Sequence, residues 1–264
     1  MQLGLFSWYG YKTPLQQRLE RVRQAGFTST MLWWGDNGLP DPQISKSLLA
    51  KVADLGLTIE NIHVKYKDMN CLWSDDDHVR REYLSQHLEY IEFCAKHHLP
   101  MMVMHISQKN EIKNPNPHGI ELIKKITEEA EALGVVIAIE NTRRVNLVEA
   151  LLDAIDNNNL GLCYDTSHGQ LYEPSGFHLL NKYPHRLKCL HISDNDGLED
   201  KHWNPYEGVI DWNRFIKCFP SQGQCKILAL ETSPKNPNES EADFLRTAYE
   251  SASKLLEGMQ KRTS

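Results

Sequence analysis

Acidic and imidazole side chains follow the apolar segments of this sequence with a regular placement that points to shared chemistry. Glu140 comes directly after VVIAI and Glu231 directly after ILAL, so each carboxylate ends a segment that should be buried and needs a partner there. The corresponding position in four other segments is held by His63, His105, Asp165 and His191, and His168 follows shortly afterwards. One such residue is most often a hydrogen-bonded packing residue or a helix cap. Six at equivalent positions favour one site that they share.

Glu140, Asp165, His191 and Glu231 are the predicted metal ligands. Three carboxylates and one imidazole form a hard, mostly oxygen donor set, which favours Mn²⁺, Mg²⁺ or Co²⁺ and leaves Zn²⁺ open. None of the six cysteines stands where it could join them. We therefore expect one divalent metal ion as the cofactor.

Short apolar runs must position this site, and most of them do not alternate between apolar and polar residues. Such uninterrupted runs are typical of parallel strands that are buried on both faces. Eight of them recur with helical patterns in between: LGLFSW (3–8), STMLWW (29–34), TIENIHV (58–64), PMMVMHI (100–106), VVIAIEN (135–141), LGLCYDT (160–166), LKCLHIS (187–193) and ILALET (227–232).

This alternation predicts an α/β fold, a single (β/α)8 TIM barrel that spans residues 1–264 as one domain. Barrel active sites lie at the carboxyl ends of the strands, where the acidic and imidazole residues stand. An open, doubly wound sheet is the rival fold. It would want a glycine-rich turn after the first strand, and Phe6-Ser7-Trp8-Tyr9 is not one.

Some connecting helices can be delimited from the sequence. Asn116 is the predicted cap of a helix with Pro117 in its first position and Gly134 beyond its end. Asn146 with Glu149 resembles a capping box. An earlier helix should bury Leu84, Leu88, Ile91 and Ala95, and the last helix should run from about Glu241 to Leu256. The long irregular stretch 198–212 is interpreted as a functional loop. The other histidines, expected in helices or turns and solvated, are His78, His87, His97, His98, His118, His178 and His185.

Composition narrows the class of partner. The formal net charge is −6 and Lys and Arg form no dense block, so the usual electrostatic sign of nucleic-acid binding is missing. No apolar run approaches the ~18 residues of a membrane span, and MQLGLFSWYG does not look like a signal peptide. The cysteines form no Cys-x-x-Cys pair, which indicates a reducing compartment. We expect a cytoplasmic protein with neither a nucleic-acid nor a membrane partner, and its oligomeric state stays open.

Taken in order, five motifs resemble the xylose isomerase-like barrel superfamily, which includes sugar and sugar-phosphate isomerases and epimerases as well as apurinic endonucleases. The resemblance covers nearly the whole chain. It implies metal ligation by Glu140, Asp165, His191 and Glu231, proton transfer by the two glutamates, and contact of His168 with a substrate oxygen. The motifs are IAIEN (137–141), CYDTSH (163–168), LHISDNDG (190–197), the Asp200-x-His202 loop with Gly208 and Ile210-Asp211-Trp212, and LALET (228–232).

The first hypothesis for the function is a divalent-metal-dependent isomerase or epimerase that acts on a small sugar or sugar phosphate. A metal ion that grips two adjacent oxygens acidifies the C–H between them and stabilises the resulting enediolate. Glu140 and Glu231 would remove and return the proton. The predicted substrate-binding residues are His63, His105, His168, His202, Trp8 and Trp34, of which the tryptophans could pack against the apolar face of the sugar.

The alternative is a zinc-dependent apurinic-site endonuclease of the same superfamily. Such relatives hold three zinc ions and need further ligands, for which His63, His105, Asp200 and His202 are candidates. Three features disfavour this reading. Ile106-Ser107 replaces Pro-Gly after His105, Ser167 replaces a Cys before His168, and Ser193-Asp194-Asn195-Asp196 is acidic where DNA phosphates would approach.

Overall fold

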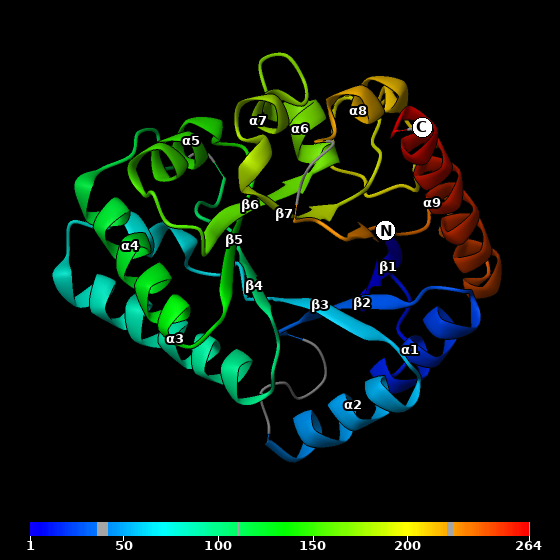
Figure 1. Ribbon diagram of the computed structural model, residues 1–264, viewed down its shortest axis with the longest axis horizontal. Helices are drawn as coiled ribbons and strands as arrows, with labels where there is room; N and C mark the ends of the chain where they lie inside the picture. Colours follow the sequence, from blue (N-terminus) through cyan, green and yellow to red (C-terminus); the bar gives the residue numbers. More distant parts are fainter. Residues whose placement is uncertain (36–41, 110, 221–223, 264) are drawn as a thin grey trace.

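The computed structural model describes residues 1–35, 42–109, 111–220 and 224–263. Within these residues, eight parallel strands form one sheet that is rolled into a barrel with helices around it (Figure 1). Each strand begins within one residue of the start of a predicted run. The strands are β1 (Gln2–Phe6), β2 (Ser29–Trp33), β3 (Thr58–His63), β4 (Met101–Met104), β5 (Val136–Glu140), β6 (Leu160–Asp165), β7 (Leu187–His191) and β8 (Ile227–Leu230).

The barrel closes at a seam between β7 and β8. The sheet order is β7-β6-β5-β4-β3-β2-β1-β8, so these two strands are its edges. Ile192, directly after β7, forms an isolated parallel bridge with Leu230. The Ile192 amide donates to the Ala229 carbonyl oxygen at 2.9 Å, and the Ile192 carbonyl oxygen accepts from the Glu231 amide at 3.0 Å. The bridge joins the two edges, which confirms the predicted TIM barrel over the open sheet.

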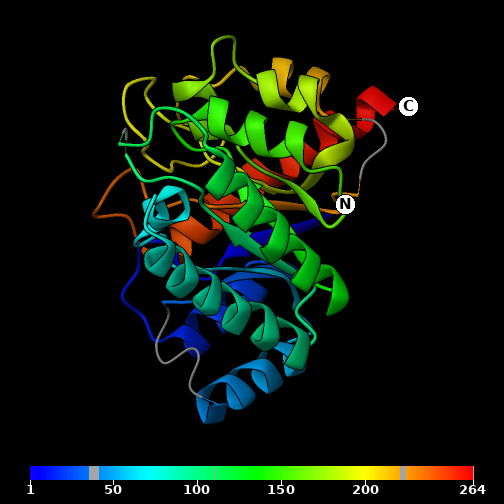
Figure 2. The same cartoon turned by 90° about the vertical axis from the view of Figure 1, so that its left-hand side faces the viewer.

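Helices follow the strands and cover the outside of the barrel. The two long helices α3 and α4 lie side by side across one face (Figure 2). None of the helices in the described ranges is long and apolar enough to cross a membrane. The α-helices are α1 (Leu15–Gln24), α2 (Pro42–Asp54), α3 (Asp77–Lys96), α4 (Pro117–Ala132), α5 (Val145–Ala154), α6 (Thr166–Tyr172), α7 (His178–Lys182), α8 (Trp212–Cys218) and α9 (Glu241–Thr263); the 3₁₀ helices are η1 (Met69–Trp73) and η2 (Pro184–Arg186).

Helix α4 begins and ends where the sequence predicts. The Asn116 side chain accepts a hydrogen bond from the Gly119 amide at 2.9 Å, and Pro117 occupies the first position. Gly134, just beyond the end of the helix, has a φ of 71°, a left-handed conformation that glycine adopts at little cost. These two signals fix the turn into β5, and β5 ends at Glu140.

Other local predictions about the helices are wrong or confirmed only in part. Asn146 does not cap α5, since the helix begins at Val145 and the side-chain Nδ2 of Asn146 donates to the Lys113 carbonyl oxygen at 2.9 Å. Helix α9 continues to Thr263, past the predicted end at Leu256. The predicted apolar stripe of α3 is confirmed in part: Ile91 is buried, while Leu84, Leu88 and Ala95 are half-buried against the core. The buried residues of α3 are Tyr83, His87, Tyr90, Ile91 and Cys94.

His87 was expected to be solvated but is buried in α3, with 1% of its surface exposed. Its Nδ1 lies 2.8 Å from the Tyr83 carbonyl oxygen, and its ring stacks on the Tyr83 ring at 4.0 Å between centroids. Burial lowers the pKa of His87 to about 4, so the imidazole is neutral in the folded protein. The sequence pattern failed here because tyrosines and a histidine, rather than leucines, fill this part of the core.

Alternation along the strands sets which residues reach the barrel axis. Ala138, Cys163, Cys189 and Ala229 pack inside the barrel, apart from the large core that lies between strands and helices. Side chains two residues apart on a strand share a face. Glu140, Asp165, His191 and Glu231 each stand two residues beyond one of these small interior residues. All four therefore point to the barrel axis, one layer above the packed interior.

The loop from β7 to α8 is a well-braced structure. The buried carboxylate of Asp194 accepts four hydrogen bonds of 2.9 to 3.1 Å, from the amides of Asn195, Tyr206 and Ile210 and from the Trp212 indole. Gly208 packs directly on this group, and a Cβ there would lie 2.1 Å from the Asn195 carbonyl oxygen. The loop thus holds Asp200 and His202 in place over the barrel.

Candidate active site

A pocket of about 370 Å³ opens at the carboxyl ends of the strands. Its floor is acidic and imidazole, and one side is aromatic. It is lined by Phe6, Trp8, Gly10, Trp33, His63, Tyr66, His105, Glu140, His168, Asp200, His202, Glu231, Thr232 and Ser233. The predicted substrate-binding residues Trp8, His63, His105, His168 and His202 are thus brought together, while their roles remain predictions.

The four predicted metal ligands converge at the base of this pocket. One ligand atom from each of Glu140, Asp165, His191 and Glu231 lies within 4.8 Å of the others. His191 Nδ1 is 3.1 Å from Glu140 Oε2 and 2.7 Å from Glu231 Oε2. Asp165 and His191 are register partners on neighbouring strands, which brings their side chains together. Strands β5 to β8 therefore build a compact group of four donors.

The donor atoms of this group fit a divalent cation. Asp165 Oδ2 and both ring nitrogens of His191 are buried and make no hydrogen bond. Leaving a buried polar atom without a partner costs ~1–3 kcal/mol, more for a charged group. A cation at the centre of the group would satisfy Asp165 Oδ2 and one ring nitrogen of His191, and carboxylate oxygens with one imidazole suit Mn²⁺, Mg²⁺ or Co²⁺.

The charges of the group are strongly coupled. Burial raises the pKa of the Glu140 carboxyl, but His105 and His191 outweigh burial and hold that pKa well below its usual value. In the same way, burial is outweighed at Glu231 by His191, and the pKa is lowered to about 2. Burial dominates at Asp165 and raises its pKa to about 7. Glu140 and Glu231 are therefore the carboxylates that stay ionised at neutral pH.

Two further histidines contact the Glu140 carboxylate from strands β3 and β4. His63 Nε2 lies 3.1 Å and His105 Nε2 3.2 Å from Glu140 Oε2. His63, Glu140 and His191 form a second group whose ligand atoms lie within 4.8 Å of one another. Glu140 and His191 thus belong to both groups, and Glu140 is also the residue that His105 contacts from β4.

Asp200 connects two other histidines at the rim of the pocket. Its Oδ2 lies 3.1 Å from His168 Nε2 and 3.1 Å from His202 Nε2. Burial would lower the pKa of His202, but Asp200 and Glu231 raise it to about 10. His168 Nδ1 lies 3.2 Å from Glu140 Oε1, so this histidine reaches the base of the pocket as well.

Trp34, a predicted substrate-binding residue, does not line the pocket, and Trp33 does. Trp34 is buried between β2 and α3, with its ring 4.5 Å from that of Tyr90 and 4.8 Å from that of Phe93 between centroids. Neighbouring residues on a strand face opposite sides, so a reading that is off by one residue exchanges the pocket for the outer core. The pair of adjacent tryptophans gave no signal that distinguishes the two sides.

Phe6, Tyr66 and Thr232 also line the pocket, although the sequence pattern did not predict them. The Trp33 ring stacks on the Tyr66 ring at 6.4 Å and 11°, and Tyr66 stacks on His105 at 5.9 Å and 27°. This row of rings leads from the pocket mouth to Glu140. Thr232 Oγ1 is buried without a hydrogen-bond partner in the pocket wall, which suits a substrate hydroxyl. The position of Thr232, directly after Glu231, was the available signal.

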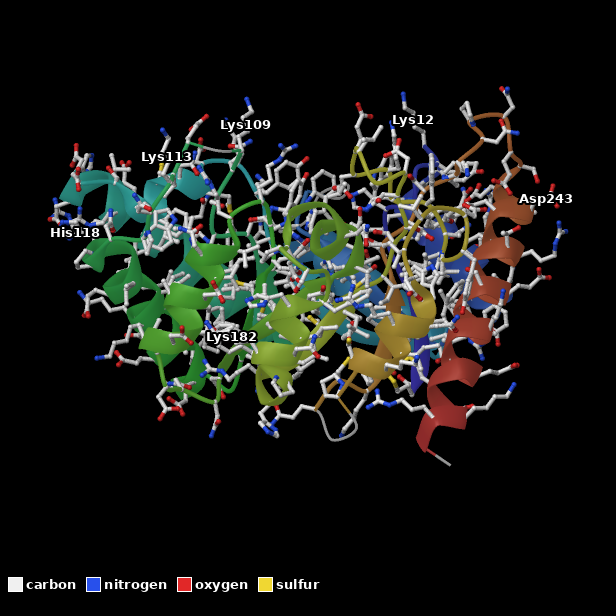
Figure 3. The ribbon with its side chains drawn as sticks, turned by 90° about the horizontal axis from the view of Figure 1, so that it is seen from above. Lys12, Lys109, Lys113, His118, Lys182 and Asp243 are labelled. Carbon is white, nitrogen blue, oxygen red and sulfur yellow. The ribbon has the colours of Figure 1, made fainter. Side chains whose placement is uncertain are left out.

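Lysine side chains lie at the rim of this face and not inside the pocket. Among the described residues, the pocket is lined by no Lys or Arg. Lys12, Lys109 and Lys113 project from the upper edge of the molecule in Figure 3, on loops that follow β1 and β4. The predicted acidic barrier to DNA is weaker than the sequence suggested, because Asp194 is buried and fully hydrogen-bonded in its loop.

The fold agrees with comparisons to known proteins. A family model for the xylose isomerase-like TIM barrel matches residues 19–248. The chain belongs to the xylose isomerase-like TIM barrel family. The resemblance seen in its motifs is confirmed. This family member is 26% identical over 284 residues to the uncharacterized protein y4fM of Sinorhizobium fredii, with 94% of the chain and 90% of the relative covered.

Solved structures similar to this xylose isomerase-like barrel include sugar-epimerase folds. D-psicose 3-epimerase from Clostridium cellulolyticum H10, solved with D-tagatose, is 16% identical with a TM-score of 0.75, and 99% of each chain is covered. A D-tagatose 3-epimerase-like protein is 19% identical with a TM-score of 0.80 over 100% of both chains. At these identities the likeness is one of fold.

Proposed function

We propose that this family member is a divalent-metal-dependent isomerase or epimerase of a sugar. The observation that carries the proposal is the convergence of Glu140, Asp165, His191 and Glu231, of which Glu140 and Glu231 line one pocket. The similarity in fold to D-psicose 3-epimerase supports the same reaction class. An ion held by these four residues would supply a Lewis acid for two adjacent oxygens of the sugar and acidify the C–H between them.

Glu140 and Glu231 are the proposed proton-transfer groups. They stand at the ends of β5 and β8, which β6 and β7 separate in the sheet, so the two carboxylates enter the pocket from different directions. Their lowered pKa values keep both ionised, and an ionised carboxylate can accept a proton from carbon. One glutamate would take the proton, and the other or the same one would return it.

The pocket lining favours a neutral sugar over a sugar phosphate. Trp8 and Trp33 offer apolar faces on one side, while His63, His168 and Thr232 offer polar atoms. Aromatic rings pack well against the C–H faces of sugars, and the polar atoms can bond hydroxyl groups. A phosphate would find no lysine or arginine among the described lining residues, and the His202 imidazole is already paired with the Asp200 carboxylate.

The proposed function is tested by proton exchange. The protein, loaded with Mn²⁺, Mg²⁺ or Co²⁺, is incubated in D₂O with D-psicose, D-tagatose or D-fructose, and NMR follows the C–H next to the carbonyl. Metal-dependent exchange together with conversion to a second sugar is expected. If none of these ketoses exchanges deuterium with any of the three ions, the proposal fails for this substrate class.

A zinc-dependent apurinic-site endonuclease is the second candidate function. The observation in its favour is that His63 and His105 lie on Glu140, next to the group of four. This reading requires zinc bound as a cluster and cleavage at abasic sites. We expect about one equivalent of metal, retained in His63→Ala, and no preference for abasic over intact duplex DNA. Three equivalents of zinc with specific cleavage at the abasic site would reverse the ranking.

A further inference from the structure

Asp200 makes more polar contacts with pocket residues than its place in an irregular loop would suggest. Its Oδ2 lies 3.1 Å from both His168 Nε2 and His202 Nε2. Its Oδ1 accepts a hydrogen bond of 2.6 Å from Ser167 Oγ, which in turn accepts one of 2.8 Å from Asn195 Nδ2. Both carboxylate oxygens of Asp200 are therefore engaged, and the side chain has one defined orientation.

Each of the two histidines extends from Asp200 to one of the proposed proton-transfer glutamates. His168 Nδ1 lies 3.2 Å from Glu140 Oε1. His202 Nδ1 lies 2.9 Å from the main-chain carbonyl oxygen of Glu231. In each of the two rings, both nitrogens thus have an oxygen atom close by, and neither imidazole can rotate without losing an interaction. The carboxylate of Asp200 fixes the outer end of both rings at once.

Asp200 stands outside the groups of potential metal ligands that the described residues form. Two such groups have ligand atoms within 4.8 Å of one another; both contain Glu140 and His191, and neither contains Asp200. His168, Asp200 and His202 do not form a third. Opposite ligands on one small divalent ion are at most ~4–4.5 Å apart, given metal–ligand bonds of ~2.0–2.2 Å. Asp200 is instead placed as a hydrogen-bond acceptor between two rings.

The loop that carries Asp200 is braced on both sides. Asp194 and Trp203 form a two-way antiparallel bridge with N–O distances of 2.8 and 2.9 Å. The Ser233 amide donates to the His202 carbonyl oxygen at 2.6 Å, and His202 adopts a left-handed φ of 52°. A non-glycine residue persists in that conformation only where its surroundings hold it. The position of Asp200 is therefore set by the fold of the loop.

We propose that Asp200 is a positioning residue, which holds His168 against Glu140 and His202 against the backbone of Glu231 and so aligns the two glutamates for proton transfer. The proposal rests on the proposed function for its kinetic consequences. Small displacements of a reacting group cost much rate, ~10²-fold for ~1 Å. Asp200 would act through the histidines and would contact neither the ion nor the reacting carbon.

The test compares Asp200→Asn and Asp200→Ala with Glu199→Gln, a matched loss of a carboxylate from the exposed neighbouring position in the same loop. With Mn²⁺ and D-tagatose as the probe, both Asp200 variants should lose about 10- to 100-fold in kcat with KM changed less than about 3-fold. The Mn²⁺ content after dialysis should equal that of the wild type, and Glu199→Gln should match the wild type throughout. Asp200→Glu should recover part of the lost kcat.

A double-substitution cycle separates positioning from general damage. Because His202 is held by Asp200, Asp200→Asn combined with His202→Gln should cost little more in kcat than the worse single variant. Loss of Mn²⁺ from Asp200→Ala would make Asp200 a ligand and overturn the proposal, as would full kcat in Asp200→Asn. If the wild type turns over no ketose, the proposed function fails. A crystal structure of Asp200→Asn then decides the positioning role: both imidazoles should leave their places while Glu140, Asp165 and His191 stay, and unmoved imidazoles would disprove it.

Discussion

The two halves of the barrel mouth differ in kind. Strands β5 to β8 contribute the carboxylates and the imidazole of the predicted metal site, and all four donors are ends of buried strands. Strands β1 to β3 contribute the rings of Phe6 and Trp33 and the loop residues Trp8 and Tyr66. His63 and His105 lie between the halves and touch Glu140. The difference is one of chemistry: one half gathers ionisable groups, which under the proposed function would bind the ion and transfer the proton, and the other presents aromatic rings, which would contact the substrate.

The largest expected effect is on the charged half. Glu140→Gln and Glu231→Gln keep the size and one oxygen of the side chain but remove the base. Each should lower turnover of an accepted ketose by at least about 10²-fold, the usual cost of a lost general base. Deuterium exchange in D₂O should show which variant still removes the proton without completing the conversion. Near-wild-type turnover in both variants would contradict the assigned roles.

Removal of the ion should also act through this half. Dialysis against EDTA should abolish turnover and lower the apparent Tm by roughly 5–10 °C, if the ion is present at about 100 times its Kd in the untreated protein. Mn²⁺ or Co²⁺ should restore both properties. Asp165→Asn serves as the matched variant, since it should be insensitive to EDTA. An unchanged Tm with full activity after chelation would exclude a metal centre.

The aromatic half offers a contrast between adjacent residues. Trp33→Ala should raise KM about 10-fold and leave the stability nearly unchanged, because Trp33 lines the pocket. Trp34→Ala should instead cost about 3–5 kcal/mol in unfolding free energy, as expected for a large buried aromatic residue, with KM unchanged. Urea unfolding and steady-state kinetics on both variants check this. The reverse pattern would mean that the strand faces are assigned wrongly.

The smallest expected effect concerns the core that packs behind Trp34. His87 has its folded pKa lowered to about 4 by burial, against an ordinary value of 6.5. The folded state therefore binds the proton more weakly, and stability is lost as pH falls through the unfolded pKa. Between pH 7 and pH 5.5, wild type should lose about 1 kcal/mol more than His87→Phe. His185→Gln, at an exposed position, is the control and should follow the wild type.

The charged half could be predicted from the sequence, whereas in the aromatic half only Trp8 could. A carboxylate that ends an apolar strand is informative because burying it without a partner is costly. Glu140 and Glu231 could therefore be recognised as candidate site residues from the sequence. Trp33 and Trp34 are both apolar, and only the register of β2 decides which one faces the pocket. Asp200 and His202 were recognised as candidates, but their link through one carboxylate oxygen depends on a loop whose path no periodic pattern encodes.

Local errors have the same origin. Asn146 has the residue type and spacing of a helix cap, yet a tertiary contact with the Lys113 carbonyl oxygen takes its side-chain Nδ2. Asp194 looked like a surface charge in an acidic segment, but its loop folds four donors around it. In each case the side chain could form hydrogen bonds with groups near in the sequence or with groups far from it, and the folded structure contains hydrogen bonds with distant groups.

The bridge at Ile192 has a consequence for how the barrel opens. Between β7 and β8 the sheet is held by the Ile192 bridge, whereas the other neighbouring strands share ladders. His191 at the end of β7 and Glu231 directly after β8 flank this bridge, and His191 Nδ1 lies 2.7 Å from Glu231 Oε2. A cation bound by both residues would cross-link β7 and β8, the pair of neighbouring strands that is joined by the Ile192 bridge. Hydrogen exchange at the amides of Ile192 and Glu231 should therefore slow when the ion binds. The exchange rates of these two backbone amides would then measure whether the metal site is occupied.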